Sequence, residues 1–190
     1  MLSYTTSASG FGLSGVSLKA NYFNISPGAT SSIEFPHLDF SAVTNPVYLD
    51  FNVAYAVFNA TSHDSLKVLL SLDCGETFTA VYAKGDNSLA TAPQTMNEFT
   101  PDPSQWRAER VDLSAYAGNP NVLIRFQYIS GYGNHLYVDD INLYDNSSST
   151  PEVTSIASGL YPNPTSGEVV FSFRAPDTGD YRLELVDVSG

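Results

Sequence analysis

The sequence contains one cysteine, Cys74, so an internal disulfide is excluded. Cys74 follows an apolar run that ends at Leu72, and we expect it to be a small buried hydrophobic residue. Basic residues are also scarce, since 8 Lys and Arg stand against 20 Asp and Glu, for a net charge of −12. Binding to phosphates or anionic lipids requires clustered Lys and Arg, so this balance argues against nucleic acid and anionic membranes as partners.

Long hydrophobic runs and motifs of catalysis are missing as well. No apolar run reaches the ~20 residues of a membrane helix, so we expect no membrane insertion. Residues 1–4 lack the basic and apolar regions of a signal peptide, and we therefore expect a longer precursor whose signal was removed or lies upstream. The three histidines have no metal-binding spacing, and nucleophile-elbow and P-loop motifs are missing. We expect no enzymatic activity.

Apolar residues with helical spacing are not sustained anywhere, whereas alternation with a period of two is frequent. The strongest alternation lies in residues 47–58, whose apolar face consists of Val47, Leu49, Phe51, Val53, Tyr55 and Val57. Further strands are predicted at 16–23, 31–40, 65–72, 77–82, 108–113, 121–129 and 135–144. These short strands predict an all-β fold, an antiparallel β-sandwich of the jelly-roll type.

A Ser-rich stretch at 146–151 has the composition of a linker. The predicted organisation is a jelly-roll module over residues 1–146, a linker over 147–157, and a small partial β-sandwich unit over 158–190. Strand-like runs at 168–173 and 181–188 belong to this second unit. A unit of this size rarely folds alone, so we expect it to be incomplete or to pack on the first domain.

Two adjacent carboxylates, Asp139 and Asp140, lie in the closing strand. Alternation predicts that they point to opposite faces, which excludes a facing acid–base pair. A carboxylate on a buried face must be paired, hydrogen-bonded or metal-bound, and calcium accepts carboxylate and amide oxygens. The candidate calcium ligands are Asp139, Glu34, Asp64, Asn134 and Asn52. The alternative is that these side chains cap turns and accept backbone N–H groups.

Aromatic residues make up 13% of the chain and suggest a sugar-binding face, although they are equally ordinary in a sandwich core. Tyr132 and Trp106 are the candidate ligand-binding residues. Tyr132 lies between two glycines, and we expect its ring to be exposed.

Residues 47–144 resemble the jelly-roll modules related to MAM and cleaved-adhesin domains of secreted bacterial proteins. The resemblance rests on an ordered series of segments at 49–56, 64–68, 71–78, 99–106, 111–114, 122–126 and 133–143. It implies a module that holds calcium at the closing Val-Asp-Asp-Ile segment and accompanies a larger protein, for example a peptidase. The family often has Asp at the position of Asn52.

Residues 160–190 resemble the start of a C-terminal sorting domain of the type IX secretion system. The opening signature is Leu-Tyr-Pro-Asn-Pro-Thr-Ser-Gly at 160–167, and residues 183–190 match the next strand and turn. This resemblance implies the type IX secretion machinery as a partner and a secreted or outer-surface location.

The resulting hypothesis is a non-catalytic, calcium-stabilised accessory or adhesion module of a secreted or cell-surface bacterial protein, with a protein or glycan ligand. The alternative hypothesis is a carbohydrate-binding module.

Overall fold

The structure is a computed structural model that describes residues 2–5, 8–10, 15–23, 25–145, 158–161 and 170–173. The chain forms two compact units, residues 1–146 and 147–190. In the second unit, β10 (Ser158–Tyr161) pairs antiparallel with β11 (Val170–Phe173). The predicted linker at 147–157 and the predicted strand at 181–188 lie outside the described residues.

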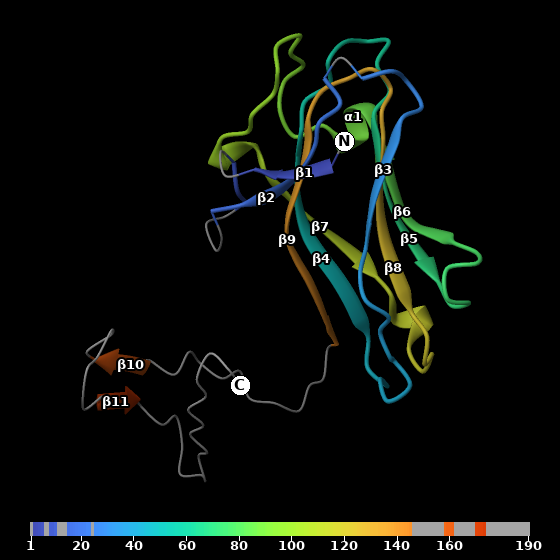
Figure 1. Ribbon diagram of the computed structural model, residues 1–190, viewed down its shortest axis with the longest axis vertical. Helices are drawn as coiled ribbons and strands as arrows, with labels where there is room; N and C mark the ends of the chain where they lie inside the picture. The colour runs from blue at the N-terminus through green and yellow to red at the C-terminus, as the bar shows by residue number, and fades with distance from the viewer. Residues whose placement is uncertain are drawn as a thin grey trace. The chain divides into compact units, whose positions relative to one another are not determined.

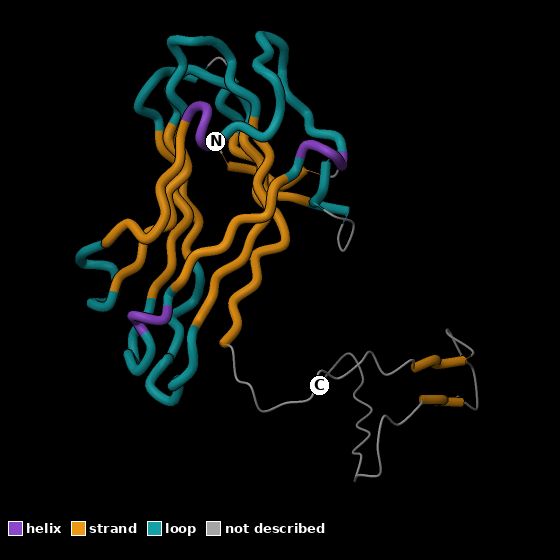
Figure 2. The backbone as a smooth tube through the Cα atoms, turned by 180° about the vertical axis from the view of Figure 1, so that it is seen from behind, coloured by secondary structure: helices purple, strands orange, loops and turns teal. Residues whose placement is uncertain are grey.

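The first unit is an antiparallel β-sandwich, as its alternating sequence predicts (Figure 1). One sheet has the order β1-β2-β9-β4-β7, built from Leu2–Thr5, Ser17–Ala20, Leu136–Asp145, Val47–Tyr55 and Arg107–Asp112. The other has the order β3-β8-β5-β6, built from Thr30–Glu34, Leu123–Ile129, Ser65–Ser71 and Thr79–Gly85. Every strand pair within these sheets is antiparallel. The connecting loops gather at the two ends of the strands (Figure 2).

The core lies between the two sheets and uses the faces that alternation predicted. Phe51 of β4 contacts Phe126 of β8 edge to face, with ring centroids 5.1 Å apart. All six predicted apolar positions of β4 and its extension belong to this core, which confirms that strand. Burying one such side chain contributes roughly 1.5–3 kcal/mol, so the shared core is the main source of stability.

The strands predicted at 65–72 and 77–82 pair as the β5–β6 hairpin, but the expectation that Cys74 is buried is wrong. Cys74 is exposed and has φ = 59°, because β5 ends at Ser71 and Cys74 lies within the turn itself. Asp73 organises this turn by accepting hydrogen bonds from the Ser71 hydroxyl and from Thr77. The Ser71 bond and the Thr77 bonds lower the pKa of Asp73 to about 2.

The segment between the strands predicted at 77–82 and 108–113 contains short helical segments, α1 (Asp86–Leu89) and a 3-10 turn at Pro103–Gln105. A second 3-10 turn, Ser114–Tyr116, follows β7. Strand β1 was not predicted, since residues 2–5 show no clear alternation. None of the helical segments described here is long and apolar enough to cross a membrane.

Buried Asp64 ties together the loops at one end of the sandwich. Its carboxylate is fully buried and accepts hydrogen bonds from the Tyr55 hydroxyl at 2.9 Å, Gly131 N at 2.7 Å and Asn134 N at 2.8 Å. Gly133 lies against this carboxylate, and an added Cβ would meet Asp64 Oδ2 at 1.7 Å. The close approach requires glycine.

Gly133→Ala should therefore lower the free energy of unfolding by roughly 3 kcal/mol, from steric overlap and lost hydrogen bonds to Asp64. Urea denaturation of the purified chain measures this change. Gly15→Ala is the matched control, because an added Cβ there meets nothing within 4 Å. Equal stability of the two variants would contradict the role assigned to the Asp64–Gly133 contact.

Candidate binding face on the five-stranded sheet

A β-bulge in β9 decides where the two adjacent carboxylates point. Asn142 pairs with Asp50 and Asp139 pairs with Asn52, so Asp140 and Ile141 together stand opposite one residue of β4. Asp140 has φ = 49°, a left-handed conformation that Asp tolerates better than most residues. The bulge shifts the alternation of the strand by one residue.

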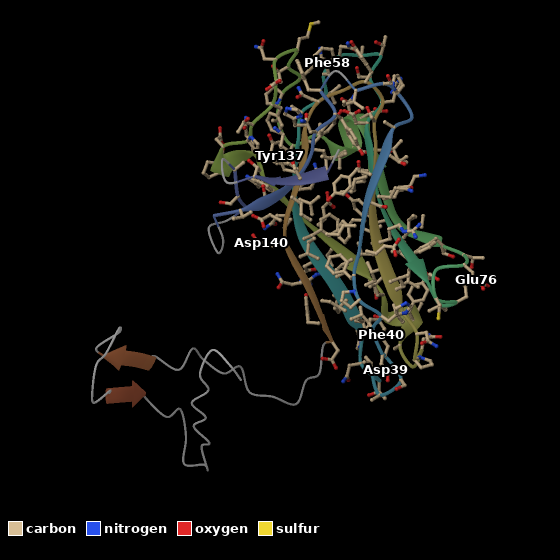
Figure 3. The ribbon with its side chains drawn as sticks, viewed as in Figure 1. Asp39, Phe40, Phe58, Glu76, Tyr137 and Asp140 are labelled. Atoms are coloured by element: carbon tan, nitrogen blue, oxygen red, sulfur yellow. The ribbon has the colours of Figure 1, made fainter. Side chains whose placement is uncertain are left out.

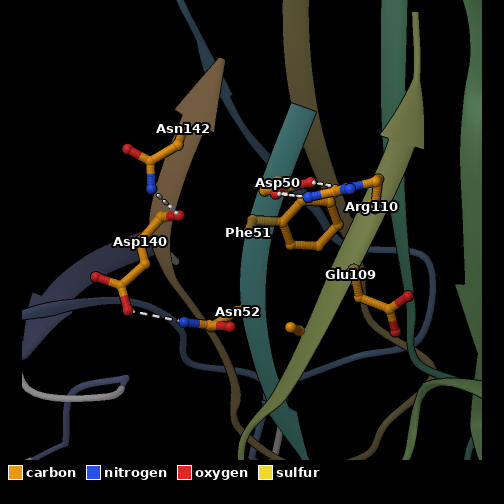
Figure 4. A pocket seen from close by; sticks show the side chains of 8 residues that line it. Asp50, Phe51, Asn52, Glu109, Arg110, Asp140 and Asn142 are labelled. Atoms are coloured by element: carbon orange, nitrogen blue, oxygen red, sulfur yellow. Dashed lines mark hydrogen bonds and ion pairs between the residues drawn. The ribbon is translucent and has the colours of Figure 1, made fainter. Parts of the chain in front are cut away.

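Because of this shift, the prediction that alternation separates Asp139 from Asp140 is wrong. Val138 before the bulge and Ile141 after it both pack in the core. Both carboxylates lie on the outer side of the sheet beside Gly10. Asp139 Oδ2 accepts a hydrogen bond from Gly10 N at 2.6 Å, and a Cβ on Gly10 would lie 3.0 Å from Asp140 Oδ2. Asp140 Oδ2 also accepts from Asn52 Nδ2 at 2.7 Å (Figure 4).

The outer face next to this pair is hollowed. A shallow pocket of about 430 Å³ lies over β7, β4 and β9, and Figure 4 shows the side chains around it. Its lining residues are Asp50, Phe51, Asn52, Ala108, Glu109, Arg110, Asp140 and Asn142. We call the outward side chains of these three strands, from Tyr48, Asp112 and Tyr144 to Asn52, Ala108 and Asp139, the open face.

A cluster of polar and aromatic side chains around Arg110 borders the pocket. Arg110 donates two hydrogen bonds to Asp50, at 2.8 and 2.7 Å, and its guanidinium carbon lies 5.2 Å from the ring centre of Tyr48 and 5.6 Å from that of Tyr144. The Tyr144 hydroxyl donates to Asp50 at 3.0 Å. The hydrogen bond from Arg110 keeps the pKa of Asp50 below its usual value. The two rings and the charged pair therefore hold one another in a fixed arrangement.

Beyond Asn52 the same face is covered. Ala54 and Ala56 continue the outward row of β4 but are fully buried beneath Phe99 and Trp106. Tyr137, labelled in Figure 3, lies at the centre of this covered cluster, and its hydroxyl donates to the carbonyl of Phe99 at 2.8 Å. The loop before β7 thus closes one end of the face.

Asn134 fastens the closing loop. Its Oδ1 accepts from Phe99 N at 2.9 Å, and its Nδ2 donates to the carbonyls of Thr95 and Asn97 at 3.2 and 2.8 Å. Its backbone N–H is the group that binds Asp64. Loop, closing strand and buried carboxylate therefore form one connected network.

The predicted metal ligands do not converge on one point. Asp64 and Asn134 meet, but Asp64 accepts three protein donors and has a structural role. Glu34 is paired with Arg125 at 2.7 Å on the other sheet. Within the described ranges, no group of three or more His, Cys, Asp or Glu side chains has a metal-binding arrangement. The structure instead brings Asp139 together with Asp140 and Asn52.

The predicted ligand-binding aromatics differ in exposure. Tyr132 is 46% exposed, as its position between glycines predicts, with φ = 66°. Trp106 is only 7% exposed and packs edge-on against Tyr137, so its ring is not presented to a ligand. Tyr144 is one of the aromatics that the sequence offers for a sugar-binding face, but Tyr48 and Arg110 were not selected from the sequence. The sequence did contain an indication: these polar or aromatic side chains lie on the faces of their strands that point away from the apolar core.

Comparisons with known proteins give neighbours in structure only. No family model matches the chain, and no curated protein matches it. Similar solved structures include the K1 and K3 cleaved adhesin domains of Lys-gingipain from Porphyromonas gingivalis W83, at 17% and 15% identity and a TM-score of 0.47 each. These alignments cover 69% of this chain and 75% and 74% of those chains. Another is CBM27-1 of Caldicellulosiruptor saccharolyticus in complex with mannohexaose, at 10% identity and a TM-score of 0.48, covering 74% and 80%.

His135 lies under the covered part of the face. It is buried beside Phe23 and Tyr137, and its Nδ1 has no hydrogen-bond partner among the described residues. Burial, together with the charge of Lys19, lowers the pKa of His135 to about 4, although Glu98 opposes this shift.

This pKa predicts a loss of stability in mild acid. The unfolded chain takes up a proton at His135 below about pH 6.5, while the folded chain does so only near pH 4. The free energy of unfolding should therefore fall between these values by up to roughly 3 kcal/mol on account of this residue. Urea denaturation from pH 7 to pH 4, compared with His135→Phe, isolates the contribution. Parallel curves for the two proteins would contradict it.

Proposed function

We propose that the first unit is a non-catalytic glycan-binding module of a secreted or cell-surface protein, with its ligand on the open face. The observation that carries the proposal is the half-exposed pair of Tyr48 and Tyr144, held by Arg110 and Asp50 beside a 430 Å³ hollow. Sugar rings pair an apolar face with a rim of hydroxyl groups. Tyrosine rings match the first, and fixed carboxylate, amide and guanidinium groups match the second.

The arrangement is suited to binding because little has to be ordered when a ligand arrives. The Asp50–Arg110 pair and the Tyr144 hydroxyl bond already fix the polar groups, and the sheet fixes the backbone below them. Affinity lost to the ordering of side chains is correspondingly small.

Arg110→Ala and Tyr144→Ala should each weaken glycan binding at least tenfold, because each removes one wall of the cluster. A glycan array followed by calorimetry on the best ligand measures the loss. Arg125→Ala is the matched control, since Arg125 forms an equivalent exposed ion pair with Glu34 on the other sheet. Loss of binding in Tyr132→Ala, with Arg110→Ala unaffected, would move the site to the loops at the end of the sandwich.

A protein ligand is the second candidate, and exposed residues in those loops favour it. Tyr132 has a strained backbone that is held on both sides, because its N–H donates to Ser130 Oγ and its carbonyl accepts from Ser62 Oγ. Met96, which is 65% exposed, lies in the loop that Asn134 fastens. A rigidly held tyrosine and an exposed methionine are typical of protein-binding surfaces.

Calcium stabilisation belongs to the same proposal, with Asp139 and Asp140 as the residues that would hold the ion. Their carboxylates lie on one side of the strand near the Asn52 amide, and such oxygen donors suit calcium. A bound calcium ion would neutralise the two negative charges and fix the Gly10 segment against β9. Glu34 is not included because it lies in an ion pair with Arg125 on the other sheet, and Asp64 and Asn134 are not included because they bind one another and the loops at the end of the sandwich.

Calcium should raise the melting temperature, by an amount equivalent to about 2.7 kcal/mol when the free ion is at one hundred times its Kd. Asp140→Asn should remove this gain, and Glu34→Gln should retain it. Differential scanning fluorimetry with calcium or EGTA makes the comparison. An unchanged melting temperature of the unaltered chain would sink the calcium part of the proposal and leave the glycan face standing.

We also infer that the module accompanies a larger secreted protein, for example a peptidase, and that residues 158–190 are the N-terminal part of a sorting domain that the type IX machinery reads. Support for the sorting domain comes from the sequence at 160–167 and 183–190. Most of these residues lie outside the part of the chain that the structure describes, so this role stays a prediction.

A further inference from the structure

We propose that the open face takes the end of a neutral glycan chain rather than the middle of one. This inference rests on the proposed function and adds the class of ligand and its orientation. The supporting observation is that one end of the face along the strands is covered by a loop, whereas the other end is exposed.

The open face is a small grid with fixed rows. Tyr48 pairs with Asp112 and Tyr144, Asp50 pairs with Arg110 and Asn142, and Asn52 pairs with Ala108 and Asp139. These three rows extend about 14 Å along the strands and about 10 Å across them, from the usual strand geometry. The area suits a short stretch of sugar rings.

One end of the grid is blocked. Along β4, the outward residues change from half-buried at Tyr48 and Asp50 to 8% exposed at Asn52 and fully buried at Ala54. The covering loop is fastened by Asn134 and by the Tyr137 hydroxyl, so the block is part of the folded structure. A glycan that follows the strands must therefore end near Asn52 and Ala108.

The β9 side of the blocked end is closed as well, by the segment Ala8–Gly10. Gly10 N donates to Asp139, and the carbonyl of Ala8 accepts from Ser17 Oγ at 2.7 Å. The opposite end is different, because Tyr144 is 37% exposed and Asp112 is exposed. On the remaining side, β7 is the edge strand of the sheet. A chain can leave the face past the tyrosines but cannot continue past Ala54.

The charges of the grid favour a neutral ligand. Four carboxylates (Asp50, Asp112, Asp139 and Asp140) accompany a single guanidinium, which Asp50 already neutralises. With Asp139 and Asp140 neutralised by calcium, Asp112 still leaves the grid negative. Uronic acids and sulfated sugars meet repulsion here. Small Ala108 leaves space at the blocked end, where the terminal ring is expected to lie.

The experiment measures how the binding capacity of a polysaccharide depends on its number of chain ends. Soluble mannan, xylan and a water-soluble cellulose derivative are titrated against the full chain before and after partial endo-hydrolysis, with polygalacturonate as the anionic probe. We expect capacity per mass of a neutral polymer to rise in proportion to the number of chain ends. Rings beyond the open face add no contacts, so the Kd of a long oligosaccharide should differ by about twofold or less from that of a short one. Mannohexaose and mannotriose are the pair to compare.

A second experiment fills the space at the blocked end of the grid with a large side chain. Ala108→Trp should weaken binding at least tenfold, whereas Ala83→Trp, an exposed alanine on the edge strand β6 of the other sheet, should leave binding unchanged. Circular dichroism and urea denaturation verify that both variants are folded.

The outcomes separate the two proposals. Capacity that follows polymer mass and not chain ends, or unimpaired binding by folded Ala108→Trp, overturns chain-end recognition and leaves glycan binding intact. Stronger binding of polygalacturonate than of the neutral polymers overturns the neutral class. Binding of none of these probes overturns the proposed function together with this inference.

Discussion

The extra residue in β9 is the constraint on which the rest of the site depends. A regular strand through residues 136–145 would direct one of two neighbouring aspartates into the hydrophobic core, where an unpaired carboxylate is costly. The bulge keeps Val138 and Ile141 on the core side and places Asp139 and Asp140 together on the outer side. One local irregularity therefore preserves the core and creates the polar end of the open face.

Around this bulge, the loops determine how much of the sheet is available. Asp64 is buried at the end of the sandwich and fixes the 131–134 turn, and Asn134 in that turn fixes the loop that covers Ala54 and Ala56. The open face ends where this cover begins. A buried network that touches no ligand thus sets the length of the surface that one would occupy.

Most of the fold could be predicted from residue order, because period-two alternation reports directly which side chains face a core. The apolar rows of β4 and β8 follow the pattern closely. Cys74 and the two aspartates were misjudged where the backbone departs from regular strand geometry: the burial of the preceding strand was extended to Cys74 in the turn, and alternation was carried through the bulge at Asp140. Both departures have left-handed backbone angles, at Cys74 and at Asp140. The Tyr48–Arg110–Tyr144 cluster was missed because it forms across three strands, from residues far apart in the sequence whose pairing only the folded register supplies.

The turn that holds Cys74 gives the molecule a convenient asymmetry. The chain's one thiol is exposed on the β5–β6 hairpin, and that hairpin belongs to the sheet that does not carry the open face. A maleimide-linked fluorophore or surface anchor attached there would leave Tyr48, Arg110 and Tyr144 uncovered. The protein therefore comes with a single built-in attachment point, which orients every immobilised copy in the same way.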